Sequence, residues 1–205
     1  DNKVPVLVGC PANVTVECDA IPAPATPTAT DNCDAQVNVL YTETKTTGTC
    51  ADYYTLNRRW IATDNCGNRS TCSQVISVVD TKAPVLVGCP ANVTVECNAV
   101  PTPATPTATD NCDKEVNITY NETKTVGTCT DAYTLTRLWR ATDNCGNATT
   151  CSQVITVRDT KAPVVTFVPA DVTLNCTDNL PPVGTPTGTD NCAAQVTVLY
   201  KGEAK

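Results

Sequence analysis

The stretch Tyr54-Thr-Leu-Asn-Arg-Arg-Trp-Ile-Ala62 alternates apolar and polar side chains with a period of two, which is typical of a β-strand with one buried face. Four apolar side chains share that face: Tyr54, Leu56, Trp60 and Ala62. Arg58 falls on the same face, and Arg137 occupies the matching position further along the chain. We expect each arginine stem to pack in the core while its guanidinium reaches the rim or a carboxylate.

Shorter segments on both sides of this strand alternate in the same way. They include Asn13–Cys18, Val37–Tyr41 and Gln74–Val79. The Pro- and Thr-rich segment 21–28 disfavours helix and suits an edge strand, and no segment has a helical stripe. About seven short strands in each repeating unit predict an all-β chain of immunoglobulin-like antiparallel β-sandwiches.

The chain repeats itself with an offset of 79 residues. The string VLVGCPANVTVEC occurs at 6–18 and 85–97, and ATDNCGN occurs at 62–68 and 141–147. The units are 1–79 (repeat 1), 80–158 (repeat 2) and 159–205 (repeat 3), of which the third corresponds only to the N-terminal half of a repeat. We expect a piece of a longer array, arranged as an elongated rod because near-identical units with short Pro-containing linkers stack in line.

Composition narrows the possible functions. The 205 residues include 14 Cys and no His, and the formal net charge is −7. Without His, a Ser-His-Asp triad and a His-ligated zinc site are impossible, and we expect no enzyme. The acidic balance argues against nucleic acid as a partner, and the absence of a run of 18 apolar residues argues against a membrane span in this segment. So many cysteines in small units predict disulfides and an extracellular location.

Four motifs carry a resemblance to a known family. They are Cys10-Pro, Ala29-Thr-Asp-Asn-Cys33, Ala62-Thr-Asp-Asn-Cys-Gly-Asn68 and Val79-Asp-Thr-Lys-Ala-Pro84. The chain resembles tandem hyalin-repeat (HYR) domains, and more narrowly the cysteine-rich repeats of giant surface adhesins of Bacteroidota. The resemblance implies an immunoglobulin-like extracellular module, and a link to gliding motility and type IX secretion. Repeat 3 departs from the pattern, since Val168 stands where the first cysteine is expected.

The leading functional hypothesis is a structural segment of a long cell-surface adhesin or filament. Its partners would be further copies of the repeat in the same chain, and an unknown surface receptor or substratum. The alternative is a carbohydrate-binding or accessory module of a secreted multidomain enzyme, for which Tyr53 and the strand of Trp60 offer the only candidate aromatic surface. Tyr53 is replaced by Ala132 in repeat 2, so such a site would not be repeated. No set of nucleophile, base and orienting group stands out, although Asp31 and Asp64 could converge.

The sandwich arrangement groups the cysteines by their place in each repeat. Cys33 and Cys66 would lie at one end, Cys18 and Cys50 at the other, and Cys10 beside Cys72. The long strand between Cys50 and Cys66 holds those two apart, well beyond the reach of a disulfide. The expected pairs are therefore Cys10–Cys72, Cys18–Cys50, Cys33–Cys66, Cys89–Cys151, Cys97–Cys129 and Cys112–Cys145. Cys176 and Cys192 would lack partners.

Aspartates gather at the expected junctions between repeats. Asp80 opens the linker and should face Asp110 and Asp143 of repeat 2, and three converging carboxylates repel one another unless a cation joins them. A structural Ca²⁺ fits such oxygen ligands, with Asn111, Asn144 and Asn147 as additional candidates. The equivalent sets are Asp1, Asp31 and Asp64, and Asp159 and Asp190. The competing interpretation is that these Asp-Asn pairs only form turns through bonds to nearby backbone N–H groups, with no other cofactor needed.

Overall fold

The computed structural model describes residues 1–179, 182 and 184–199. Repeat 1 contains six strands and one short 3-10 helix: β1 (Val6–Val8), β2 (Val14–Glu17), η1 (Cys18–Ala20), β3 (Thr28–Thr30), β4 (Asn38–Thr47), β5 (Tyr54–Thr63) and β6 (Arg69–Val79). Repeat 2 has the same order: β7 (Val85–Val87), β8 (Val93–Glu96), η2 (Cys97–Ala99), β9 (Thr107–Thr109), β10 (Asn117–Val126), β11 (Tyr133–Thr142) and β12 (Ala148–Arg158). The predicted all-β class is confirmed.

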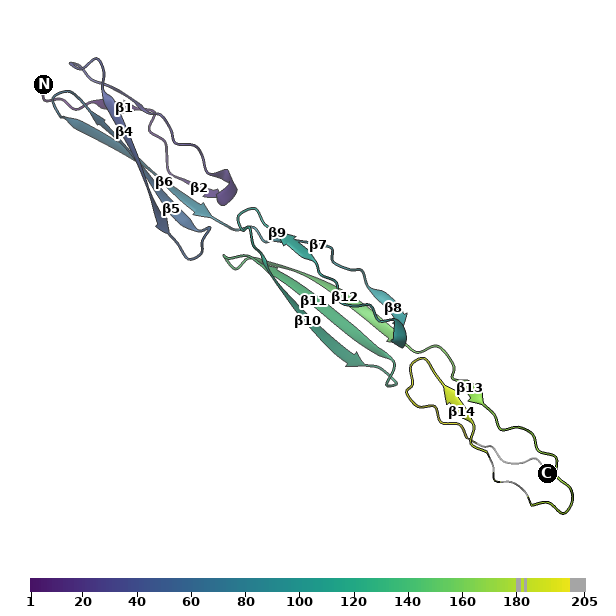
Figure 1. Cartoon of the computed structure of the whole chain (residues 1–205). Helices are drawn as coiled ribbons and strands as arrows, with labels where there is room; N and C mark the ends of the chain where they lie inside the picture. Colours follow the sequence, from purple (N-terminus) through teal and green to yellow (C-terminus); the bar gives the residue numbers. More distant parts are fainter. Residues whose placement is uncertain (180–181, 183, 200–205) are drawn as a thin grey trace. The chain divides into compact units, whose positions relative to one another are not determined.

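Each of these repeats is a small sandwich of two sheets. In repeat 1 the larger sheet has the order β2-β6-β5-β4, and the smaller sheet pairs β1 with β3 (Figure 1). Pairing is antiparallel except for the edge strand β2, which runs parallel to β6. Repeat 2 repeats both sheets, as β10-β11-β12-β8 and β7-β9. The segment 21–27 forms no strand, because its prolines cannot donate to a ladder, and β6 begins five residues before the predicted Gln74.

The core of repeat 1 is built by two neighbouring strands with a period of two. From β5 it takes Leu56, Trp60 and Ala62, and from β6 it takes Ile76 and Val78, all of them at most 8% exposed. The same positions are buried in repeat 2. The partly buried Val16, Cys18, Ile21 and Tyr54 pack against the cluster of Leu56, Ile76 and Val78. The alternation seen in the sequence therefore marks the buried face of the larger sheet.

Arg58 is a charged member of this core, as the sequence predicted. It is 4% exposed, and its Nε donates to Glu43 Oε2 at 2.7 Å while Nη1 donates to the Pro22 carbonyl at 2.9 Å. Tyr41 also donates its hydroxyl to Glu43. These two donors, Arg58 first, lower the pKa of Glu43 below its ordinary value of 4.5. The carboxylate therefore favours the folded state at neutral pH, and this contribution is lost as the pH falls through the lowered pKa.

Replacement of Arg58 by alanine is expected to lower the free energy of unfolding by about 2 kcal/mol. Breaking a buried ion pair typically costs about 3–5 kcal/mol, and the value is reduced here because Glu43 is one-third exposed and can be hydrated. The neighbouring Arg59→Ala is the matched control, since Arg59 carries the same charge on the exposed face. Urea unfolding measures both variants, and equal losses would show that Arg58 has no special place in the core.

The described chain divides into two compact units whose boundary passes through repeat 2. The first unit comprises Asp1–Val87, Pro106–Thr119 and Trp139–Cys151, and the second comprises Gly88–Thr105, Tyr120–Leu138 and Ser152–Lys205. Repeat 3 contributes β13 (Val164–Phe167) and β14 (Thr187–Thr189), which pair antiparallel. No helix in the described part of the chain is long and apolar enough to cross a membrane.

Candidate functional site

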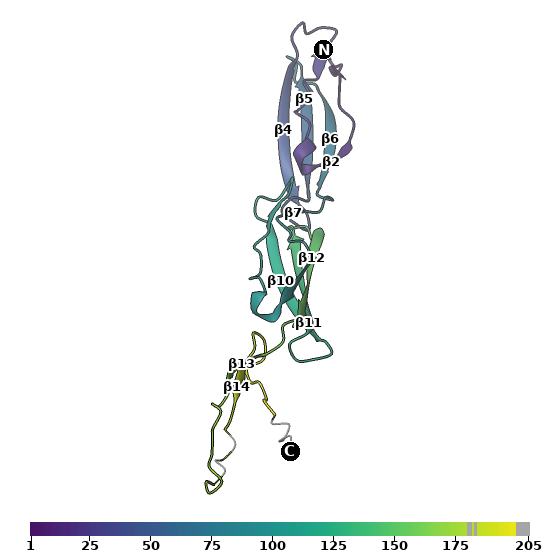
Figure 2. The same ribbon diagram turned by 90° about the vertical axis from the view of Figure 1, so that its right-hand side faces the viewer.

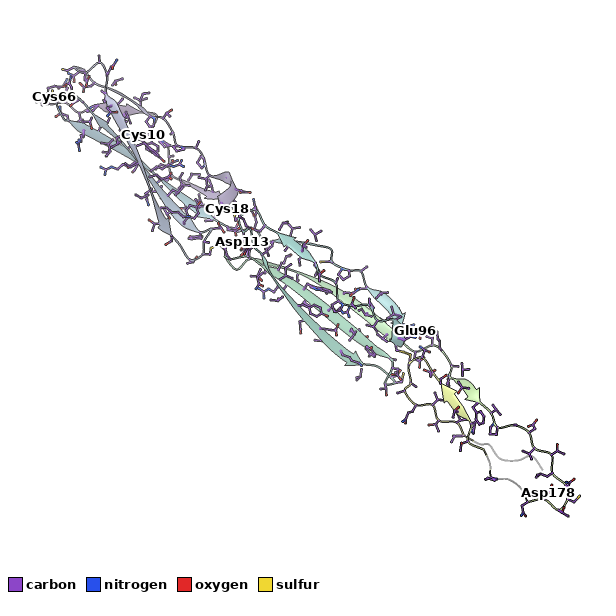
Figure 3. All side chains as sticks on the ribbon, in the orientation of Figure 1. Cys10, Cys18, Cys66, Glu96, Asp113 and Asp178 are labelled. Atoms are coloured by element: carbon purple, nitrogen blue, oxygen red, sulfur yellow. A yellow bond between two sulfur atoms is a disulfide. The ribbon has the colours of Figure 1, made fainter. Side chains whose placement is uncertain are left out.

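The strand directions give each repeat two ends. β2 and β6 of repeat 1 run to the same end, where β5 begins, so η1, the β4–β5 loop 48–53 and the linker after Val79 lie together there; we call this the trailing end. The leading end holds the loops 31–36 and 64–68, which are joined by a bond from the Asn65 N–H to Asp34. Figure 3 shows Cys66 at the leading end and Cys18 at the trailing end.

The first compact unit joins the trailing end of repeat 1 to the leading-end loops of repeat 2. These loops are 110–115, after β9, and 143–147, between β11 and β12. Two disulfides make the join covalent: Cys18–Cys112, with a Cα–Cα distance of 5.7 Å, and Cys50–Cys145, with 5.1 Å. We call this region the stapled junction. In the second unit, Cys97–Cys192 makes the equivalent bond, from the trailing end of repeat 2 to repeat 3.

The predicted pair Cys18–Cys50 is wrong, and the sheet order explains why. Cys18 follows β2 and Cys50 lies in the loop after β4, and these are the two outer strands of the larger sheet (Figure 2). Three strand spacings of about 4.8 Å separate them by about 14 Å, twice the Cα distance of about 7 Å that a disulfide tolerates. The two cysteines share an end of the repeat but lie at opposite edges of it.

Three other predicted pairs are also wrong. Cys112 and Cys145 each face one trailing-end cysteine, so they also lie at opposite edges and do not pair with each other. Cys33–Cys66 is also wrong: these residues match Cys112 and Cys145 in position, and both are free and exposed. Cys97–Cys129 is wrong because Cys97 bonds Cys192, which was expected to be unpaired. Cys129 and Cys176 are free and exposed.

The pair within a single repeat was predicted correctly. Cys10 bonds Cys72 with a Cα–Cα distance of 6.2 Å, and the matching cysteines of repeat 2, Cys89 and Cys151, are also disulfide-bonded. The sequence did carry a signal for the bonds between repeats. Repeats 1 and 2 each have two such cysteines at each end, and stacking them places two trailing cysteines against two leading ones, with separations of 94 and 95 residues.

The leading-end loops of repeat 2 are shaped by aspartate side chains. Asp110 Oδ1 accepts from the N–H groups of Cys112 and Asp113, and Asp143 Oδ1 accepts from those of Cys145 and Asn147. These bonds place Cys112 and Cys145 opposite their partners. They are also the turn-forming bonds of the competing interpretation, but they use only one oxygen of each carboxylate.

The second oxygens of the predicted aspartates have no partner. The Oδ2 atoms of Asp80, Asp110 and Asp143 are buried and accept no hydrogen bond. Asp80 is 6% exposed and Asp143 is 7% exposed. Burial raises the pKa of Asp80, and the charges of Asp110 and Asp143 raise it further. The structure therefore places Asp110 and Asp143 near enough for their charges to act on Asp80, as the sequence grouping predicted.

A fourth carboxylate, which the sequence did not predict, lies beside Asp80. A carboxylate oxygen of Glu17 lies within 4.8 Å of one from Asp80 and of the Cys112 sulfur. Glu17 accepts bonds from the hydroxyl and N–H of Thr81, which hold it against the linker. We call Glu17, Asp80, Asp110 and Asp143 the junction carboxylates. The only sequence signal for Glu17 is its place at the end of β2, beside the cysteine that bonds repeat 2.

The other two predicted sets differ from this one. At the leading end of repeat 1, Asp64 Oδ2 accepts from the Asn68 side chain at 2.8 Å, Asp1 is exposed, and Asp31 Oδ2 alone is buried without a partner. In the second unit, Glu96 and Asp159 each offer a carboxylate oxygen within 4.8 Å of the other and of the Cys192 sulfur. Asp190 there shapes its loop through bonds from the N–H groups of Cys192 and Ala193.

Residues 86–157, most of repeat 2, match the family model of the HYR-like domain with 4 cysteines. Among solved structures, human CDH23 EC21-23 aligns over 91% of this chain and 80% of its own, with 15% identity and a TM-score of 0.36. Drosophila N-cadherin EC1-4 aligns over 80% of this chain with 15% identity and a TM-score of 0.31, and the chain spans 53% of that solved structure. The Ig1-2 module of Drosophila DLAR aligns over 77% of this chain and all of its own, with 14% identity and a TM-score of 0.27.

The match of repeat 2 to this family model agrees with the resemblance seen in the sequence. The structure has small all-β sandwiches in series, with ten of the 14 cysteines in disulfides, as suits an extracellular location. Repeat 2 is thus similar to HYR-like domains with four cysteines.

Proposed function

We propose that this chain is a load-bearing stalk segment of a long cell-surface adhesin or filament, whose disulfides prevent it from lengthening under tension. The observation that carries the proposal is the pair of bonds Cys18–Cys112 and Cys97–Cys192, each of which joins one repeat to the next. The resemblance to surface adhesins of Bacteroidota supports a role in attachment and suggests gliding motility and type IX secretion as its setting.

The mechanical consequence follows from the covalent path between the two bonds. Tension entering at Cys18 crosses to Cys112, runs back along the chain to Cys97, and crosses again to Cys192. Only the segment 97–112, about 15 residues or about 50 Å when extended, lies in that path. Without any disulfide, the chain between Cys18 and Cys192 could extend to about 600 Å. Unfolding the sandwiches would therefore release almost no length.

Single-molecule force spectroscopy on the whole chain tests this proposal. Pulled between its termini, the oxidised chain loads about 45 residues, in the segments 1–18, 97–112 and 192–205, and is expected to reach a contour length of about 160 Å. After reduction, the expected contour length is about 700 Å. An oxidised chain that lengthens as far as the reduced one would contradict the proposal.

A matched pair of double variants separates the two kinds of disulfide. Cys97→Ser with Cys192→Ser opens the load path and should lengthen the oxidised chain by more than half, to at least about 80 loaded residues or about 270 Å. Cys10→Ser with Cys72→Ser removes a bond inside repeat 1 that lies outside the shortest path, so the contour length should stay near the wild-type value. Equal lengthening by both variants would show that the bonds between repeats have no special mechanical role.

A further inference from the structure

The junction carboxylates are acidic, and none of them forms an ion pair with a Lys or Arg side chain among the described residues. Three of the four carry a buried Oδ2 atom without a hydrogen-bond partner, and Asp80 and Asp143 are more than nine-tenths buried. The nearest linker cation is Lys82, but its Nζ pairs with Asp19 at 3.2 Å, and only its backbone N–H reaches Asp80. A buried carboxylate oxygen without a donor is costly, so the arrangement calls for a cation.

We propose that Glu17, Asp80, Asp110 and Asp143 bind a Ca²⁺ ion at the stapled junction. All four offer oxygen, and hard cations such as Ca²⁺ take 6–8 oxygen ligands in flexible geometries, with water and backbone carbonyls completing the shell. The sulfur nearest to the cluster belongs to Cys112, which is in a disulfide and offers no thiolate, and the chain has no histidine. The donor set therefore disfavours zinc and other metals that prefer nitrogen and sulfur.

The turn bonds leave the ligand atoms available. In Asp110 and Asp143 the Oδ1 atom holds the loop, while Oδ2 is the atom without a partner. The side-chain amide of Asn147 donates to the backbone carbonyl of Asp80 at 3.1 Å. It makes no bond to Asp143 Oδ2. At the start of repeat 1 the equivalent Asn68 does bond Asp64 Oδ2. The cluster at the junction is thus more open to a cation than its counterpart in repeat 1.

The proposed site draws its ligands from both sides of the junction. Glu17 comes from β2 of repeat 1, Asp80 from the linker, and Asp110 and Asp143 from the leading-end loops of repeat 2. A bound ion would fix the same surfaces that the two disulfides hold covalently. The carboxylates of Glu96 and Asp159, with Asp190, occupy three of the four equivalent positions in the second unit, so a related site can form there.

The test compares thermal unfolding and calcium titration for the whole oxidised chain. Extracellular modules bind Ca²⁺ with dissociation constants of about 0.1–1 mM, so titration calorimetry with CaCl₂ into the millimolar range should detect binding. Asp143→Asn keeps Oδ1 for the turn and removes one charge, and it should weaken binding at one site at least tenfold. Glu115→Gln is the matched control, since it removes an exposed carboxylate outside the cluster and should leave the affinity unchanged within twofold.

A reversal in stability distinguishes a metal site from a merely crowded cluster. In EDTA, Asp80→Asn should raise the melting temperature, because it relieves repulsion among the junction carboxylates. In 5 mM CaCl₂ the same variant should melt below wild type, because it has lost a ligand. No detectable calcium binding, an equal loss of affinity in Glu115→Gln, or a variant that is more stable in both buffers would each overturn the proposal.

Discussion

Replacing Cys18 and Cys112 together by serine is expected to lower the free energy of unfolding of the oxidised chain by about 3 kcal/mol. The disulfide between them closes a loop with a sequence separation of 94 residues, and a loop of that size restricts the unfolded chain by about 4–5 kcal/mol. The expected value is lower because Cys50–Cys145 still bridges the same two repeats and retains part of the restriction. At about 2–4 °C per kcal/mol for a chain of this size, the melting temperature should fall by about 6–12 °C.

The control for this experiment is the pair of cysteines that was first expected to bond within repeat 1. Cys33→Ser with Cys66→Ser removes two exposed free thiols, so its effect on the free energy of unfolding should stay within about 0.5 kcal/mol. Differential scanning calorimetry under non-reducing conditions measures both variants. A larger loss in the Cys33 and Cys66 variant than in the Cys18 and Cys112 variant would contradict the assignment.

Replacing Trp60 by alanine is expected to cost about 3–5 kcal/mol, the usual range for a fully buried aromatic side chain. Trp60 is 2% exposed, and its ring lies 5.3 Å from that of Tyr41. Its Nε1 also donates to the Ala25 carbonyl at 3.2 Å, which ties the Pro-rich segment to the sheet. So small a core has little other apolar volume with which to fill the cavity, and we expect repeat 1 to be the part that unfolds first.

Trp60→Phe separates packing from the hydrogen bond. Phenylalanine keeps an aromatic ring on the buried face but leaves the Ala25 carbonyl without its donor, so a loss of about 1–2 kcal/mol is expected. Urea unfolding of the two variants gives both values. If Trp60→Ala cost no more than Trp60→Phe, the ring would not be a central part of the core.

The strand pattern was predictable because a period of two directly reports which side chains share a face of a sheet. Tyr54, Leu56, Trp60 and Ala62 lie on the inner face, and even the buried Arg58 could be placed there, because the period holds whatever the residue type. Strand boundaries were less predictable. The polar residues that begin β6 have no alternation, and their strand structure comes from pairing with β5.

The disulfide partners could not be obtained from the ends of the repeat alone. Placing Cys18 and Cys50 at one end was right, but the strand order that puts them at opposite edges depends on contacts between residues far apart in sequence. The grouping of the junction aspartates was easier to predict than the disulfides. Asp80 lies in the linker and Asp110 and Asp143 in the loops that follow it in the next repeat, and this holds whatever the strand order. Which oxygens lack a partner depends on side-chain geometry that no spacing reveals, and so does the approach of Glu17.

Disulfide mapping of the oxidised chain is the most direct test of the claim that adjacent repeats are covalently joined. Free thiols are alkylated first, and cleavage after Lys, Arg, Asp and Glu then places Cys18, Cys33, Cys50 and Cys66 in four different peptides. The expected result is a peptide containing Cys18 linked to one containing Cys112, a second link between Cys50 and Cys145, and alkylated Cys33 and Cys66. A link from Cys18 to Cys50, or from Cys33 to Cys66, would contradict it.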